Sequence, residues 1–237
     1  MSVLLIDAGN SRIKWRYQAD DGVMVRGGCD HADVVDQAWP KVARVLVSSV
    51  HDNPWLRHQL EQQFGASLVW LSRALADYPD FKHCYPNPER LGVDRWLAML
   101  GARQHCNGPV LVVDSGTALT LDLMDADNQH LGGYIVPGLT LAQQSLWQNT
   151  ERVRPYTDEQ MSDKLQPGTD TVGCVSAGVR RQQVALVQQL MQEYRHHTPF
   201  FTGGDGEWLA RSLDQTYSPE LIFDGLDALC AGYSSVW

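Results

Sequence analysis

The residues best suited to chemistry stand at two turns of the same design. Residues 3–17 run from an apolar stretch into Asp7, one further residue and a glycine, and then into a stretch of alternating apolar and polar residues. Residues 110–123 repeat this order around Asp114. A glycine lets a phosphate approach backbone N–H groups, and an aspartate can hold a hydrated divalent cation. The pattern therefore predicts two related phosphate-binding turns.

Asp-x-Gly is also a common turn, so either copy alone is explained more simply by turn formation. Two copies at matching places, and a third glycine-rich turn at Thr202–Asp205 after another apolar strand, favour a site for a nucleotide and its metal. The P-loop and Rossmann glycine motifs are both missing from the sequence. Lys14, on the second strand of the first hairpin, is either a solvated strand lysine or a phosphate contact.

Asp94 is a candidate general base. It lies in residues 91–95, where a helix is expected to begin, and its simplest role is a first-turn carboxylate that interacts with the helix dipole beside Arg95. The proline-rich stretch 76–90, expected to be an irregular loop, and Gly92 suit the wall of a pocket. Asp94 could therefore also accept a proton from a hydroxyl group. The residues alone leave both roles open.

Hydrophobic periodicity predicts a framework of mixed strands and helices. Strands are expected in the two hairpins and over 43–50, 67–71, 131–138 and the stretch before Thr202. Helices are expected from an Asn53 cap followed by Pro54, over 91–106, after 139, over 175–196 and, as the final helix, near 206–214. Two similar halves of this kind predict an α/β protein with a cleft between the halves.

Composition excludes several classes of protein. The chain has 237 residues, 19 Lys and Arg against 28 Asp and Glu, and a formal net charge of −9. This balance argues against a general nucleic-acid binder but permits a local site for small phosphates. No apolar stretch reaches the roughly 18 residues of a membrane span. The first residues lack the basic region of a secretory signal, so we expect no such signal.

The other reactive side chains indicate no further site. The cysteines are odd in number and scattered, which predicts reduced thiols in a cytoplasmic protein: Cys29, Cys84, Cys106, Cys174 and Cys230. No serine hydrolase motif is present. Several histidines show no metal-ligand spacing and are expected at the surface: His51, His58, His83, His105, His130, His196 and His197.

Five motifs, in order along nearly the whole chain, resemble those of the type III pantothenate kinases of the acetate and sugar kinase/Hsp70/actin superfamily. They are D-x-G-N-[ST]-x-x-K at Asp7–Lys14, Y-x-N-P-x-x-L-G-x-D-R at Tyr85–Arg95, D-x-G-T-A-x-T at Asp114–Thr120, G-G-x-I-x-P-G at Gly132–Gly138 and T-G-G at Thr202–Gly204. Each motif alone is modest evidence, but five in order are strong evidence. Ser11 replaces a commoner threonine and keeps its hydroxyl, whereas residues 76–86 match no family pattern.

The resemblance implies an actin-like ATPase fold of two ribonuclease H-like halves with a nucleotide cleft between them. Residues 1–108 would carry the first phosphate loop and the pantothenate-binding segment, and residues 109–237 the second phosphate loop and the adenosine-side turn. The implied reaction is the ATP-dependent phosphorylation of pantothenate to 4'-phosphopantothenate, the first step of coenzyme A biosynthesis. The implied cofactors are Mg²⁺ and potassium or ammonium, and the implied assembly is a cytoplasmic homodimer.

The resemblance also assigns residues. Asp94 would be the proton acceptor, Asp7 would bind Mg²⁺ through water, and Asp114 would bind the monovalent cation. ATP would be bound by Asp7, Ala8, Gly9, Asn10, Ser11, Arg12, Ile13, Lys14 and Thr117. Pantothenate would be bound by Tyr85, Gly92, Val93, Asp94, Arg95 and, in a looser match, Thr171. The helices expected at 139–149 and 175–196 would form the dimer interface.

Two alternatives stay open. One is another small-molecule kinase or a phosphohydrolase of the same fold. The other is a non-catalytic accessory or regulatory relative, in which we would expect Asp94 to be missing or the first phosphate loop to be broken. Both features are intact in this sequence, which favours an enzyme.

Overall fold

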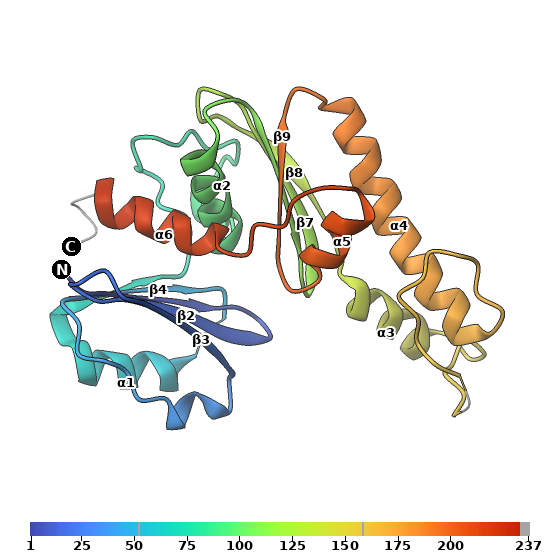
Figure 1. Cartoon of the computed structure of the whole chain (residues 1–237), viewed down its shortest axis with the longest axis horizontal. Coiled ribbons are helices and arrows are strands. Elements are labelled where there is room, and N and C mark those ends of the chain that lie inside the picture. The colour runs from blue at the N-terminus through green and yellow to red at the C-terminus, as the bar shows by residue number, and fades with distance from the viewer. Residues whose placement is uncertain (52, 158, 233–237) are drawn as a thin grey trace. The chain divides into compact units, whose positions relative to one another are not determined.

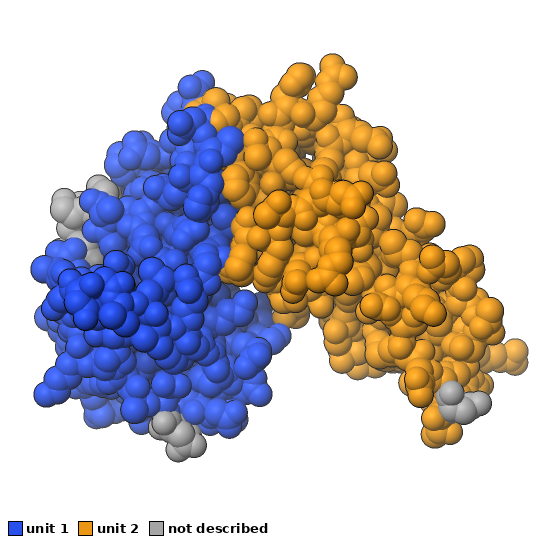
Figure 2. Space-filling view, in the orientation of Figure 1, with its two compact units in different colours: residues 1–107, 127–130, 220–237 blue, residues 108–126, 131–219 orange. Residues whose placement is uncertain are grey.

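The computed structural model describes residues 1–51, 53–157 and 159–232, which form two compact units. Figure 2 colours the two units separately. Unit 1 contains residues 1–107, the short segment 127–130 and the chain from Glu220 onward, and unit 2 contains residues 108–126 and 131–219. The segments 127–130 and 220 onward thus group with unit 1, whereas the sequence analysis placed everything after residue 108 in one half.

Unit 1 is built on a five-stranded sheet in the order β3-β2-β1-β4-β5. β1 pairs antiparallel with β2 and parallel with β4. The expected hairpin and the strands expected at 43–50 and 67–71 are therefore confirmed. The strands are β1 Val3–Ala8, β2 Arg12–Gln18, β3 Met24–Asp30, β4 Arg44–Ser49 and β5 Leu68–Leu71.

The helices of unit 1 cover both faces of this sheet, as Figure 1 shows. α1 (Pro54–Phe64) packs Leu56 and Leu60 into a core with β1 and β4. Its predicted cap is confirmed, because the side-chain oxygen of Asn53 accepts a hydrogen bond of 2.9 Å from the Leu56 N–H. α2 (Val93–His105) and α6 (Leu221–Gly232) lie on the other face. Short 3₁₀ turns occur at Asp33–Asp36, Gly65–Ser67 and Pro88–Arg90.

The sequence analysis missed both β3 and α6. β3 has mostly exposed side chains, so it lacks the alternation that marks a half-buried strand. The expectation that the final helix lies near 206–214 is wrong, because α6 follows it. α6 packs so closely on α2 that a Cβ on Gly101 would overlap the Leu221 carbonyl oxygen, and a Cβ on Gly225 would overlap that of Leu97.

Arg16 of β2 also ties α6 to unit 1. Its buried guanidinium bonds to the carboxylates of Glu220 and Asp224, each at 3.2 Å, to Asp227, and to the Phe223 carbonyl at 3.0 Å. Burial raises the pKa of Asp227, and the Arg16 guanidinium opposes that rise. The charge cluster and the helix contact together explain why α6 belongs to unit 1.

Unit 2 is built on a four-stranded sheet in the order β8-β7-β6-β9. β6 pairs antiparallel with β7 and parallel with β9, and side chains of β6, β7, α4 and α5 form its core. The strands are β6 Val110–Ser115, β7 Ala118–Met124, β8 His130–Pro137 and β9 Thr198–Thr202. The helices are α3 Leu139–Asn149, α4 Thr171–Glu193 and α5 Gly206–Ser212.

The sequence predicts neither disulfides nor a membrane span, and the described residues can be compared with both predictions. None of the five cysteines, all of which lie within those ranges, forms a disulfide. Among the helices described, none is long and apolar enough to cross a membrane.

The contact between α2 and α6 can be tested with two helical glycines. Gly101→Ala is expected to lower the free energy of unfolding by about 2 to 3 kcal/mol, because its methyl group would push α6 away from α2. Gly178→Ala is the control, because a Cβ at this position in α4 meets no atom within 4 Å, and we expect a change of at most about 1 kcal/mol, in the stabilising direction. Urea unfolding followed by circular dichroism measures both; equal stabilities would contradict the close packing.

Candidate active site

The first turn joins β1 to β2 and exposes its polar tip. Asp7 pairs with Lys14 across the hairpin, and the Gly9 N–H donates a hydrogen bond of 3.1 Å to the Arg12 carbonyl. Residues 10–12 are exposed, and so is Lys14. The turn therefore presents its backbone and short polar side chains to any ligand, while the pairing holds Asp7 at the end of its strand.

The second turn joins β6 to β7 in the same arrangement. Asp114 pairs with Thr120 on the antiparallel strand and lies beside Thr202 on the parallel strand β9. In unit 1, Asp7 likewise lies between an antiparallel partner and Ser48 on the parallel strand β4. The internal repeat seen in the sequence is thus a repeat of strand order as well as of residue type.

The third glycine-rich turn packs directly against the second. Gly203 has a φ of +91°, and a Cβ there would overlap both the Asp114 carboxylate and the Ser115 carbonyl oxygen. The Asp205 N–H donates a hydrogen bond of 2.8 Å to that Ser115 carbonyl, and the Tyr217 hydroxyl donates one of 2.9 Å to the Gly203 carbonyl. Only glycine meets both requirements at position 203.

The end of β8 reaches the same turn from another direction. The Gly138 N–H donates a hydrogen bond of 3.0 Å to the Thr117 carbonyl. A Cβ on Gly138 would overlap the carbonyl oxygens of Gly116 and Thr117. Three motifs that are far apart in the sequence, at Asp114–Thr120, Gly132–Gly138 and Thr202–Gly204, therefore meet around one turn.

Asp205 completes this group with a perturbed carboxyl. Burial raises its pKa, and the positive charge of Arg180 on α4 opposes the rise. Arg180 is held in place by a hydrogen bond of 2.7 Å to the Ser176 hydroxyl, and its guanidinium lies 5.4 Å from the ring centre of Trp208. The sequence analysis did not connect Arg180 with this turn, because the second half of α4 and the strand β9 separate the two in the sequence.

Asp94 lies in the first turn of α2, as expected. One of its carboxylate oxygens accepts a hydrogen bond of 2.8 Å from the Arg95 N–H. A Cβ on Gly92 would lie 2.6 Å from that same oxygen, so glycine leaves room for the carboxylate. The guanidinium of Arg95 is buried and donates a hydrogen bond of 3.0 Å to the Tyr85 hydroxyl. The structure thus brings Tyr85, Gly92, Asp94 and Arg95 together.

His130 supports this group, and the expectation that it lies at the surface is wrong. It is fully buried, and its ring stacks on Tyr85 with the ring centres 6.0 Å apart. Its Nδ1 lies 3.2 Å from the Cys84 sulfur. His130 reaches this position because the backbone of Lys82 pairs with that of Gln129. These segments are far apart in the sequence, so no local pattern predicts the contact.

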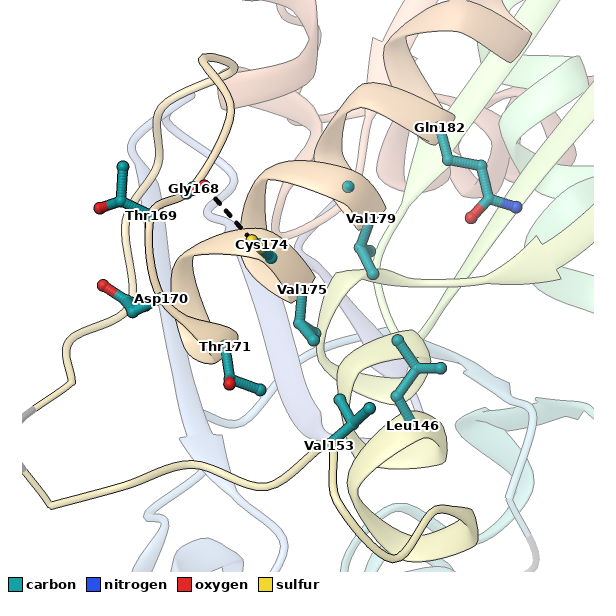
Figure 3. A pocket seen from close by; sticks show the side chains of 11 residues that line it. Leu146, Val153, Gly168, Thr169, Asp170, Thr171, Cys174, Val175, Val179 and Gln182 are labelled. Carbon is teal, nitrogen blue, oxygen red and sulfur yellow. Dashed lines mark hydrogen bonds between the residues drawn. The ribbon is translucent and has the colours of Figure 1, made fainter.

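Thr171 is the first residue of α4 and belongs to unit 2, whereas Tyr85 and Asp94 belong to unit 1. The helix begins four residues before the expected 175 and is capped by Asp170, whose carboxylate accepts a hydrogen bond of 2.6 Å from the Gly173 N–H. A cavity of about 690 Å³ opens beside Thr171. Figure 3 shows its lining, which includes Leu146, Val153, Thr171, Cys174, Val175 and Val179.

Within the described residues, no group of three or more His, Cys, Asp or Glu side chains could hold a metal ion by itself. The Asp114 carboxylate and the Ser115 carbonyl oxygen lie close to each other at the second turn, because both approach Gly203 so tightly that a Cβ there would overlap them. Oxygen donors of this type suit hard cations.

Comparison with known proteins identifies the family. The family model for type III pantothenate kinases matches residues 3–193. The type III pantothenate kinase of Dichelobacter nodosus is 35% identical over 244 residues, covering 95% of this chain and 96% of that protein.

Solved structures show the fold. A Campylobacter jejuni protein assigned to the Baf family of transcriptional activators is similar with a TM-score of 0.64 and 26% identity, covering 95% of this chain and 96% of that one. A Sinorhizobium meliloti protein assigned as a 2-dehydro-3-deoxygalactonokinase shares the fold, with a TM-score of 0.56 and 11% identity over 98% of this chain and 99% of that one. The expected actin-like α/β fold is therefore confirmed. On the match to residues 3–193 and the near full-length identity, the chain belongs to the type III pantothenate kinase family.

Proposed function

We propose that this chain transfers the γ-phosphoryl group of ATP to the primary hydroxyl of pantothenate and forms 4'-phosphopantothenate, the first step of coenzyme A biosynthesis. The observation that carries the proposal is the family match, with all five motifs of the family intact. Phosphoryl transfer depends mainly on positioning and on neutralising charge, which suits glycine-rich turns and a single well-held carboxylate.

Asp94 is the proposed proton acceptor. The Arg95 N–H fixes one carboxylate oxygen, and the small Gly92 leaves the carboxylate its space. A carboxylate is a weak base for an alcohol, so Asp94 would orient the hydroxyl and take its proton late in the transfer. At the N-terminus of α2 the helix dipole interacts favourably with the negative charge of this carboxylate.

Pantothenate would be held by Tyr85 and by the Gly92–Arg95 segment, with Thr171 as a further contact. The hydrogen bond between Arg95 and Tyr85 supports this assignment, because it orients both side chains next to Asp94. Pantothenate carries a carboxylate. The guanidinium of Arg95, next to Tyr85 and Asp94, supplies a fixed positive charge that would attract this carboxylate.

ATP would be bound by the first turn, from Asp7 through Lys14, and by Thr117 in the second. Mg²⁺ supplies charge neutralisation on the transferring phosphoryl group when it is bound, and Asp7 would hold it through water. A potassium or ammonium ion would be held by Asp114, whose carboxylate lies close to the Ser115 carbonyl oxygen at the turn that Gly203 packs against. These oxygens fit such an ion chemically.

A cytoplasmic homodimer is the proposed assembly, formed through α3 and α4. Leu141 and Leu146 of α3 are large apolar side chains with 44% and 39% of their surfaces exposed, which is a cost for an isolated subunit. Burial of these side chains against a second copy would remove that cost.

The decisive measurement is ADP release with Mg²⁺, with and without pantothenate and with and without potassium. We expect release that requires both pantothenate and the monovalent cation. If the rate of ADP release is the same with and without pantothenate, the chain is another small-molecule kinase or a phosphohydrolase of this fold. A well-folded protein with no turnover would favour the non-catalytic accessory or regulatory role.

Asp94→Asn tests the proton acceptor. It keeps the size of the side chain and is expected to lower kcat by about 10²- to 10⁴-fold, with ATP affinity changed less than about twofold, because only proton uptake and hydroxyl orientation are lost. Steady-state kinetics and ATP titration measure the two effects. Asp20→Asn, at an exposed position between β2 and β3 in unit 1, is the control. Unchanged kcat in Asp94→Asn would remove Asp94 from this role.

Asp114→Ala tests the cation site. Loss of the carboxylate is expected to abolish most of the stimulation by potassium or ammonium, because the remaining carbonyl oxygen cannot balance the ionic charge. Initial rates over a series of potassium concentrations measure the response. The exposed Asp163→Ala in the same unit should keep the wild-type response. A normal potassium response in Asp114→Ala would refute the assignment.

A further inference from the structure

His31 contacts the first turn from the position directly after β3, the strand that the sequence analysis missed. It follows β3 directly, and its Nε2 lies 2.8 Å from the carbonyl oxygen of Gly9. Its Nδ1 lies 3.4 Å from the side-chain nitrogen of Asn53. His31 therefore bridges the turn and the N-terminus of α1, two segments that are 44 residues apart at Gly9 and Asn53.

The direction of these hydrogen bonds follows from the helix cap. The oxygen of the Asn53 side chain already accepts from the Leu56 N–H at 2.9 Å, so the amide nitrogen must be the atom that faces His31. An amide nitrogen only donates, so His31 Nδ1 accepts and the ring proton lies on Nε2. The Nε2–H then donates to the Gly9 carbonyl.

That hydrogen bond sets the orientation of the peptide plane at the tip of the turn. In a trans peptide the C=O and the following N–H point in opposite directions. Holding the Gly9 carbonyl toward His31 therefore turns the Asn10 N–H away from it, on a turn whose residues 10–12 are exposed. If this peptide turned over, a carbonyl oxygen would replace the N–H and would repel a phosphate.

Other groups around His31 have contacts of their own. The His51 ring meets the His31 ring edge-on, with the ring centres 6.1 Å apart. Arg12 and Asp30, which flank the turn and His31, form an exposed ion pair of 3.3 Å. The hydrogen bond to Gly9 is the contact through which His31 acts on the turn itself.

We propose that His31 is a positioning residue for the phosphates of the nucleotide, acting through the Gly9–Asn10 peptide. His31 holds the Gly9 carbonyl toward itself, which leaves the Asn10 N–H free to face a phosphate. Asn53 keeps the imidazole in the tautomer with its proton on Nε2, which this hydrogen bond requires. The inference rests on the proposed function, because it takes the first turn as the site of ATP phosphates. It adds a residue outside the five motifs to that site.

The test compares ATP binding in His31→Ala, His31→Gln and the wild type by calorimetry with Mg²⁺, which needs no turnover. We expect His31→Ala to weaken ATP binding about five- to tenfold, the effect of losing one positioning hydrogen bond. His31→Gln can place an N–H near the position of Nε2 and should return to within about twofold of the wild type. His58→Ala, an exposed histidine on α1, is the matched control and should bind normally.

Steady-state kinetics separates positioning from a structural role. His31→Ala is expected to raise KM for ATP by the same factor while kcat and KM for pantothenate change less than about twofold. A loss confined to kcat, or equal ATP affinity in folded His31→Ala and wild type, would overturn the proposal. Failure of His31→Gln to restore binding would also count against the hydrogen bond.

Asn53→Ser keeps the proposal testable if His31→Ala does not fold. Serine is a good helix cap, so α1 should persist, but the donor to Nδ1 is lost and the imidazole is free to take its other tautomer. ATP binding is expected to weaken about two- to fourfold with unchanged circular dichroism, and unchanged binding would refute the tautomer argument. If the wild type shows no pantothenate-dependent turnover while these variants still weaken ATP binding, the proposed function fails and the role of His31 stands.

Discussion

The absence of side chains at Gly138 and Gly203 is the constraint on which the arrangement of unit 2 depends. The carbonyl oxygens of residues 115–117 occupy the space that a Cβ on either glycine would need. The end of β8 and the turn after β9 can therefore approach the turn after β6 as closely as backbone permits. This approach brings the Asp114 carboxylate and the Ser115 carbonyl oxygen next to Gly203 and close to each other.

The first turn has the same strand order but a different support. Its aspartate lies between an antiparallel and a parallel neighbour, as Asp114 does. The contacts at its tip come from side chains instead, since His31 holds the Gly9 carbonyl and Asn53 holds His31. A repeated backbone plan can thus be stabilised by close glycine packing in one unit and by a chain of hydrogen bonds in the other.

Family membership and geometry support different parts of the proposed function. The match to the type III pantothenate kinases determines the reaction class, because the chain and its relatives align over nearly their full lengths. Geometry contributes the physical roles, such as the carboxylate of Asp94 held by the Arg95 N–H and the guanidinium of Arg95 bonded to Tyr85. The Asp94 carboxylate explains the glycine at 92, and the stacking on Tyr85 explains the burial of His130, a residue outside the five motifs.

The sequence by itself determined the features whose causes are local. Alternating residues predicted both hairpins, an asparagine followed by proline predicted the start of α1, and the helical spacing of apolar residues after 139 predicted α3. The motifs also predicted the residues of the candidate site, because the residues of each motif are close together in the sequence and their spacing can be recognised there.

Tertiary structure alone decided the features that join distant residues. β3 has too little burial to leave a pattern, and α6 belongs to unit 1 through Arg16, more than 200 residues away in the chain. His31 and His130 gain their roles only when Gly9 and Tyr85 are brought to them. A side chain's partners in a folded protein depend on long-range packing, and local periodicity carries no information about contacts of that range.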